Sequence, residues 1–88
     1  MDKICTLQGM AIVVLDRGFV YVGCVTIEGD WCVITEARNI RHWGTKNGLG
    51  ELVNGPLKET KLDFVGNLRA PLRAVISLID VNESKWKS

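Results

Sequence analysis

The sequence has little of what catalysis at neutral pH requires. Its 88 residues contain one histidine, His42, and three cysteines, none of them in a C-x-x-C arrangement. General acid–base chemistry at neutral pH usually employs histidine, and a zinc site needs several His or Cys ligands at short spacing. No Walker or dinucleotide glycine fingerprint is present either. We therefore predict a protein that is not an enzyme, with no catalytic residue, no metal and no cofactor.

Long apolar runs and a disulfide framework are also missing. The longest strongly apolar run, residues 10–15, has six residues, whereas a membrane span needs roughly 20 and a secretory signal needs a longer core. Cys5, Cys24 and Cys32 form an odd set, and free cysteines are among the most buried residues. We expect buried, inert thiols and a chain that stays in the cytoplasm without contacting a membrane.

An excess of one charge sign is lacking as well. Eleven Lys and Arg against ten Asp and Glu give a net charge of +1, which argues against binding duplex DNA by bulk electrostatics. The length fits one domain over residues 1–88, with a core at about 8–81 and a polar tail at 82–88. An apolar content of 47% is high for so small a domain. We therefore expect a homo-oligomer that covers part of this surface.

β-branched residues dominate the first 43 positions, without sustained helical spacing. Acidic and glycine residues at 16–18 and 28–30 interrupt the apolar runs, which predicts two consecutive hairpins. If the second hairpin pivots on Gly29, Val25 lies opposite Val33 and Cys24 lies opposite Ile34. Apolar side chains then occupy both faces of the sheet, which indicates barrel closure or burial between subunits.

Strand patterns return at 61–65 and 73–81, after one predicted helical turn at 51–53 and a stop signal at 54–56. The fold class that fits is mainly β: a small, strongly bent antiparallel barrel of the SH3-like or Sm-like kind with one short helical turn. A compact α+β sheet protein is the alternative. We expect most of the tail to be frayed unless the Trp86 indole docks.

One segment concentrates groups that bind anions and bases. Residues 38–50 hold three cations, the histidine, a tryptophan and three glycines. Arginine binds phosphate with paired hydrogen bonds, tryptophan stacks on bases, and glycines let backbone N–H groups approach a ligand. The alternative is a mobile loop with its tryptophan anchored in the core. The predicted ligand-binding residues are Arg38, Arg41, His42, Trp43, Thr45 and Lys46.

A sparser basic set surrounds the last predicted turn. Arg69 and Arg73, four residues apart across Pro71, share one side of an extended segment, with Lys58 further back in the chain. These cations face either a phosphate or solvent.

Five strings of the sequence form a recognisable set, at residues 17–23, 34–45, 48–52, 54–56 and 69–76. The most specific of them are an Ala-Arg-x-Ile-Arg-x-Trp-Gly-Thr string and a Gly-Leu-Gly-Glu-Leu string. Together they resemble a family of small proteins of unknown function that tailed bacteriophages and prophages encode, and the likeness covers residues 10–81. The resemblance implies a phage accessory protein that acts in the host cytoplasm, and it implies no known chemistry.

Three hypotheses about function follow from these observations. The leading one is a counter-defence protein that sequesters a nucleotide-type signalling molecule between subunits of an oligomeric barrel, with the 38–46 segment holding phosphate and base. The second is an inhibitor that binds a host enzyme by strand addition or by docking a barrel face. The third is an Sm-like ring that binds single-stranded RNA.

Overall fold

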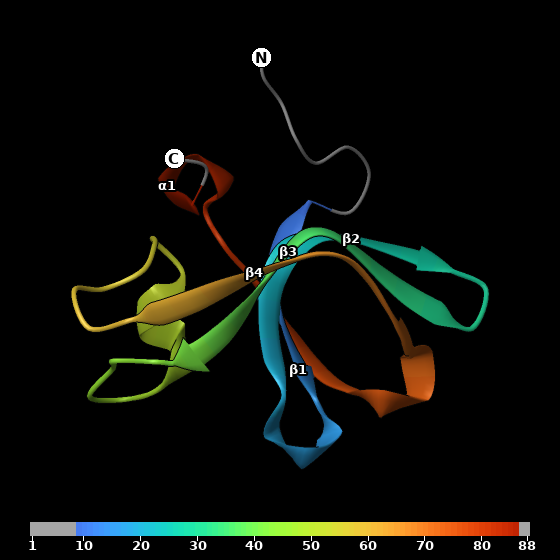
Figure 1. Cartoon of the computed structure of the whole chain (residues 1–88), viewed down its shortest axis with the longest axis horizontal. Helices are drawn as coiled ribbons and strands as arrows, with labels where there is room; N and C mark the ends of the chain where they lie inside the picture. The colour runs from blue at the N-terminus through green and yellow to red at the C-terminus, as the bar shows by residue number, and fades with distance from the viewer. Residues whose placement is uncertain (1–8, 87–88) are drawn as a thin grey trace.

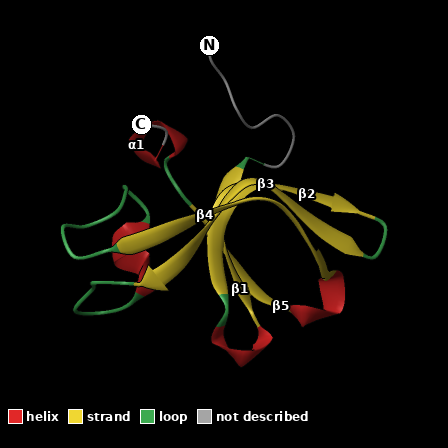
Figure 2. Cartoon of the chain, viewed as in Figure 1, coloured by secondary structure: helices red, strands yellow, loops and turns green. Residues whose placement is uncertain are grey.

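A computed structural model of the protein, in which residues 9–86 are described, contains one five-stranded antiparallel sheet (Figures 1 and 2). The strand order is β4-β3-β2-β1-β5. Short helical turns separate some strands: η1 (Asp16–Gly18), η2 (Leu49–Leu52), η3 (Leu72–Ala74) and the terminal α1 (Glu83–Trp86). The strands are β1 (Met10–Leu15), β2 (Val20–Glu28), β3 (Trp31–His42), β4 (Lys61–Pro71) and β5 (Val75–Asp80).

The mainly β prediction is confirmed, and the helical turn expected at 51–53 is present as η2, two residues earlier. Closure into a barrel is not observed. Each strand pairs with its neighbours in the order given above, and within residues 9–86 no pairing joins the two outer strands, β4 and β5. The sheet is therefore bent but open, with β4 and β5 as its edges.

The second hairpin has a different register from the predicted one. Glu28 pairs with Trp31 and Val25 pairs with Ile34, so the expected opposition of Val25 to Val33 is wrong by one residue, as is that of Cys24 to Ile34. The connection is a two-residue turn in which Gly29 has a φ of 59°. Glycine at the first of two central positions is typical of a type II′ turn. With two residues in the turn instead of one pivot at Gly29, each residue of β2 from Cys24 to Glu28 pairs with the residue one position later in β3 than predicted.

Three neighbouring strands bend along one line across the sheet. Gly23 in β2 lies where the register with β3 shifts, and Ala37 in β3 pairs with Gly66 in β4. Glu36, beside Ala37, has a φ of 53°, and Gly66 has a φ of 100°. Such irregularities increase twist and bend a strand. Figure 1 shows the result at the centre of the view, where β3 and β4 turn.

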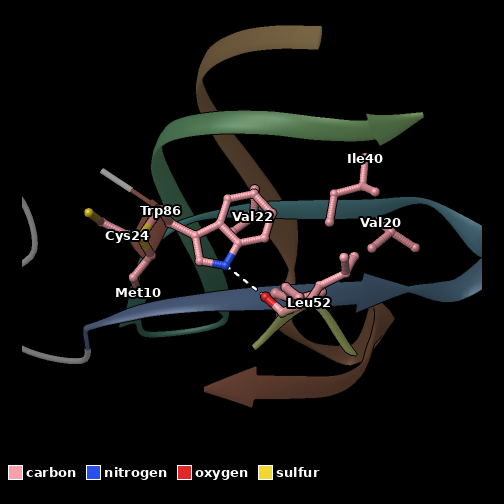
Figure 3. Packing of buried hydrophobic residues seen from close by; sticks show 8 residues of the cluster. Met10, Val20, Val22, Cys24, Ile40, Leu52 and Trp86 are labelled. Atoms are coloured by element: carbon pink, nitrogen blue, oxygen red, sulfur yellow. Dashed lines mark hydrogen bonds between the residues drawn. The ribbon is translucent and has the colours of Figure 1, made fainter. Parts of the chain in front are cut away.

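Apolar side chains fill both faces of the central strands, as the sequence predicts. Residues 10 and 12 of β1 belong to one buried group, and residues 11, 13 and 15 belong to another. We call the first the Trp86 cluster, because Trp86 and Leu52 cover it (Figure 3). Its buried members are Met10, Ile12, Val20, Val22, Cys24, Ile40, Leu52 and Trp86. The second, the Cys32 cluster, comprises Ala11, Val13, Leu15, Val25, Cys32, Ile34, Ala37 and Ala70.

The tail is held by its tryptophan. The Trp86 side chain is 1% exposed, and its Nε1–H donates to the Leu52 carbonyl at 2.8 Å (Figure 3). The condition attached to the fraying prediction is therefore met, and residues 83–86 form α1. Residues 87 and 88 lie outside the described part of the chain.

The cysteines differ from one another. Cys32 is a free thiol with no exposed surface, and burial raises its pKa, as expected for an inert thiol. Cys24 is also buried, but the expectation of a free thiol is wrong there because Cys24 is disulfide-bonded. Cys5 lies outside the described residues. None of the helices described between residues 9 and 86 has the length and apolar character to cross a membrane.

Candidate functional site

The six predicted ligand-binding residues lie at the end of β3 and in the connection to η2. Arg38, Arg41 and His42 belong to β3, and Trp43, Thr45 and Lys46 follow it. Because side chains alternate between the two faces of a strand, this segment distributes its groups instead of directing them to one point. Their individual contacts show this dispersion.

Arg38 is engaged with the C-terminal tail. One guanidinium nitrogen donates to the Trp86 carbonyl at 2.8 Å, and the guanidinium carbon lies 5.6 Å from the centre of the indole ring. A cation over an aromatic face is attracted by the ring quadrupole. Arg38 thus holds the residue that covers one core cluster.

Arg41 is paired with β4. Its Nε donates to Asp63 Oδ2 at 2.8 Å, with side chains 59% and 52% exposed. An exposed pair of this kind contributes little to stability, but it occupies the Nε donor of the guanidinium. His42 is exposed and pairs across the sheet with Lys61.

Trp43 is 41% exposed, so the alternative interpretation of this segment, with a tryptophan anchored in the core, is wrong for the side chain. The Trp43 carbonyl accepts a hydrogen bond from Thr60 Oγ1 at 2.7 Å, which joins the two ends of the β3–β4 connection. Thr45 is half-buried, and Lys46 is exposed.

The backbone of the glycine-rich loop binds a carboxylate from the same chain. The Lys46 and Asn47 N–H groups donate to the two oxygens of Glu51, at 3.2 and 2.6 Å. Consecutive N–H groups of this kind form an anion-binding concavity. The sequence predicted that backbone N–H groups of this loop approach a ligand, and in the structure two of them bind Glu51.

We predict that Glu51→Ala lowers the free energy of unfolding by about 1 kcal/mol, because two backbone donors lose their acceptor. Amide hydrogen exchange at Lys46 and Asn47 should accelerate, as measured by NMR. Glu59→Ala, which removes an exposed carboxylate from the same connection, is the control and should leave both amides unchanged. Equal exchange in both variants would contradict the bonding role of Glu51.

The second basic set is divided between the two ends of β4. The Arg69 guanidinium lies 5.7 Å from the centre of the Trp31 ring. Arg73, in η3, lines a cavity of about 420 Å³ together with Asp30 and Leu72. Lys58 precedes β4 and lies at the other end of that strand from this cavity.

The cavity lies between the β2–β3 turn and η3. The Leu72 N–H donates to the Asp30 carbonyl at 2.8 Å, and Trp31 pairs with Pro71, so the two segments are held together. Within residues 9–86, neither the Asp30 carboxylate nor the Arg73 guanidinium forms a hydrogen bond or ion pair. A carboxylate, a guanidinium and an apolar side chain thus line one hollow, with both charged groups available to a ligand.

Sequence reasoning identified one of the three lining residues that the structure describes. Arg73 was noted in the second basic set, whereas Asp30 was considered only as part of the turn signal at 28–30. No local signal marks Asp30, because the pairing of β3 with β4 brings it close to η3, more than 40 positions along the chain.

The fold and the cavity define a mainly β protein with one open antiparallel sheet and a charged hollow at one end of it. Comparisons with protein-family models, curated proteins and solved structures find no match. In the part of the chain that the structure describes, no group of three or more His, Cys, Asp or Glu side chains is placed to hold a metal ion.

Proposed function

We propose that this protein is a non-enzymatic binding module for a nucleotide-type small molecule, which it holds in the cavity formed by Asp30, Leu72 and Arg73. The observation that carries the proposal is that a guanidinium and a carboxylate line one hollow, neither of them bonded to another group within residues 9–86. Its volume of about 420 Å³ is in the range of small-molecule sites.

The chemistry of the three residues supports this ligand class. Arg73 supplies a planar set of donors for a phosphate. Asp30 accepts hydrogen bonds from a ribose hydroxyl or an exocyclic base amine, and Leu72 offers apolar contact to a base. The neighbouring Arg69 adds positive potential, although its guanidinium is stacked on Trp31. The proposal keeps the nucleotide hypothesis and moves its site away from residues 38–46, where both arginines, Arg38 and Arg41, have side-chain partners within the chain.

The wider context of the proposal rests on the resemblance to phage and prophage proteins. An accessory protein that sequesters a nucleotide signal in the host cytoplasm would act against host defence. We also propose that the sheet is an open form of a small SH3-like barrel, since β1–β4 form a meander and β5 returns to pair with β1 after a helical turn.

Isothermal titration calorimetry with a panel of cyclic and linear nucleotides tests the proposal. Removing one charge-assisted contact weakens binding by about tenfold or more, so Arg73→Ala and Asp30→Asn should each lose affinity to that extent. Arg41→Ala, which removes an exposed guanidinium at the opposite end of β3, is the matched control and should bind normally. The absence of heat with every nucleotide would overturn the proposal.

The same titrations also test the originally predicted site and the RNA-binding hypothesis. Loss of binding in Arg41→Ala but not in Arg73→Ala would return the site to residues 38–46. A single-stranded RNA oligonucleotide in the panel tests the ring hypothesis, which requires binding that weakens steeply as salt rises.

A further inference from the structure

The outer strand β5 forms one edge of the sheet in the part of the chain that the structure describes. β5 pairs with β1 on one side, and in the described part of the chain no strand pairs with its other side. Its central residues Ile76, Ser77 and Leu78 are exposed, with Ile76 at 65% and Leu78 at 43%. An exposed apolar edge with free N–H and C=O groups is a template for adding another strand.

The opposite edge, β4, is protected by comparison. It carries Lys61, Asp63 and Arg69 beside the exposed Phe64 and Val65, ends at Pro71, and is bent at Gly66. Charges, proline and bends are devices by which natural proteins prevent pairing at an edge. Residues 75–79 of β5 contain no charge and no proline, and the strand has one register shift in its pairing with β1, between Ser77 and Val75. The difference in charge and proline content favours β5 as the edge that accepts a partner.

We propose that β5 pairs antiparallel with β5 of a second copy of this chain, about a two-fold axis that passes through Ser77. In this register Ile76 faces Leu78 of the second copy, and the same contact repeats across the axis. The two exposed apolar side chains of the strand thereby cover each other. Backbone hydrogen bonds then join two sheets into one.

Charge at the ends of β5 selects this orientation. Arg73 lies just before the strand and Asp80 is its last residue. Antiparallel pairing brings Asp80 of one copy beside Ala74 and Arg73 of the other, so that unlike charges meet at both ends. A parallel arrangement would instead place Asp80 next to Asp80. The inference goes beyond the proposed function and does not rest on it.

Sedimentation equilibrium of the full chain tests for the dimer. The wild-type protein should be a dimer at micromolar concentration, and a variant with Ile76→Lys and Leu78→Lys should be a monomer with an unchanged circular dichroism spectrum. Phe64→Lys, at a β4 residue that is 71% exposed, is the matched control and should remain dimeric. A monomeric wild type, or a dimer lost in Phe64→Lys alone, would overturn the proposal.

Cross-linking tests the position of the axis. Directly opposed residues in an antiparallel pair have Cα atoms about 4.5–5.5 Å apart, which a disulfide can span. Oxidation should therefore join two copies of Ser77→Cys covalently, but not two copies of the wild type or of Asn67→Cys, a β4 variant. Cross-links that form only when Ser77→Cys is mixed with Asn67→Cys would show β5-to-β4 pairing and would refute the two-fold arrangement.

Charge reversal separates this inference from the proposed function. Asp80→Arg should weaken the dimer by about tenfold or more, since like charges then meet at both ends. Adding Arg73→Asp should restore the dimer, although the same change removes the guanidinium proposed to hold a nucleotide. Failure of the second change to restore a weakened dimer would contradict the charge pairing. Nucleotide binding and dimerisation are thus read out separately.

Discussion

Replacing Trp86 with alanine is expected to lower the free energy of unfolding by about 3–5 kcal/mol, the usual range for removing a buried aromatic side chain. Trp86 is 1% exposed and packs with residues of β1, β2, β3 and η2. The variant also leaves the Leu52 carbonyl without its indole donor and removes the ring on which the Arg38 guanidinium lies. All three effects act in the same direction.

Urea denaturation followed by far-ultraviolet circular dichroism measures this loss without depending on tryptophan fluorescence. Trp43→Ala is the matched control, because Trp43 is 41% exposed. Its hydrogen bond with Thr60 is accepted by the backbone carbonyl, which alanine retains. A change of about 1 kcal/mol or less is expected there. If the two variants were equally stable, the tail would not be part of the core.

The tail illustrates what the sequence does and does not predict. Its apolar residue was recognised as the one able to dock, but its partners Leu52 and Arg38 lie 34 and 48 positions away. Local composition carries no information about such distant contacts. The surplus of apolar residues was likewise recognised, and the structure shows that η2 and α1 cover part of it through Leu52 and Trp86.

The candidate site shows the same limit. Residues 38–50 contain the groups that bind phosphates, and their backbone does form an anion-binding loop. Whether that loop accepts an external anion depends on Glu51, four residues beyond Asn47, and on the pairing of Arg41 with Asp63 across the sheet. Residue types predict the kind of interaction, whereas register and turns determine which partner takes part.

The hairpins give the clearest physical reason for the remaining error. Acidic and glycine residues predicted the turn at 28–30 correctly, but the same residues are compatible with either a three-residue or a two-residue connection between the strands. A change of one residue moves each side chain relative to its neighbour on the next strand. The bend runs through Gly23, Ala37 and Gly66, and the sequence alone does not show that these three residues lie in one line across three strands.

Substituting Gly23 with alanine should destabilise the protein by about 3 kcal/mol, at the upper end for overpacking, because a methyl group has no room at this bend. A Cβ atom there would lie 2.7 Å from Ile34 Cγ2, 2.8 Å from the Thr35 carbonyl oxygen and 3.1 Å from the Ala37 Cα. Two of these neighbours are backbone atoms, so a rotamer change cannot relieve the contact. The penalty is steric, since the φ of Gly23 is not in the left-handed region.

Gly50→Ala provides the control for the same chemical change. A Cβ atom at Gly50 would meet nothing within 4 Å, and the φ of this residue is also not in the left-handed region. Alanine there restricts the unfolded chain and should stabilise the protein by up to about 1 kcal/mol. Urea denaturation should therefore show a lower free energy of unfolding for Gly23→Ala and a higher one for Gly50→Ala. A Gly23→Ala protein as stable as Gly50→Ala would show that β2 and β3 do not approach each other closely at the bend, and the curvature of the sheet would then need another cause.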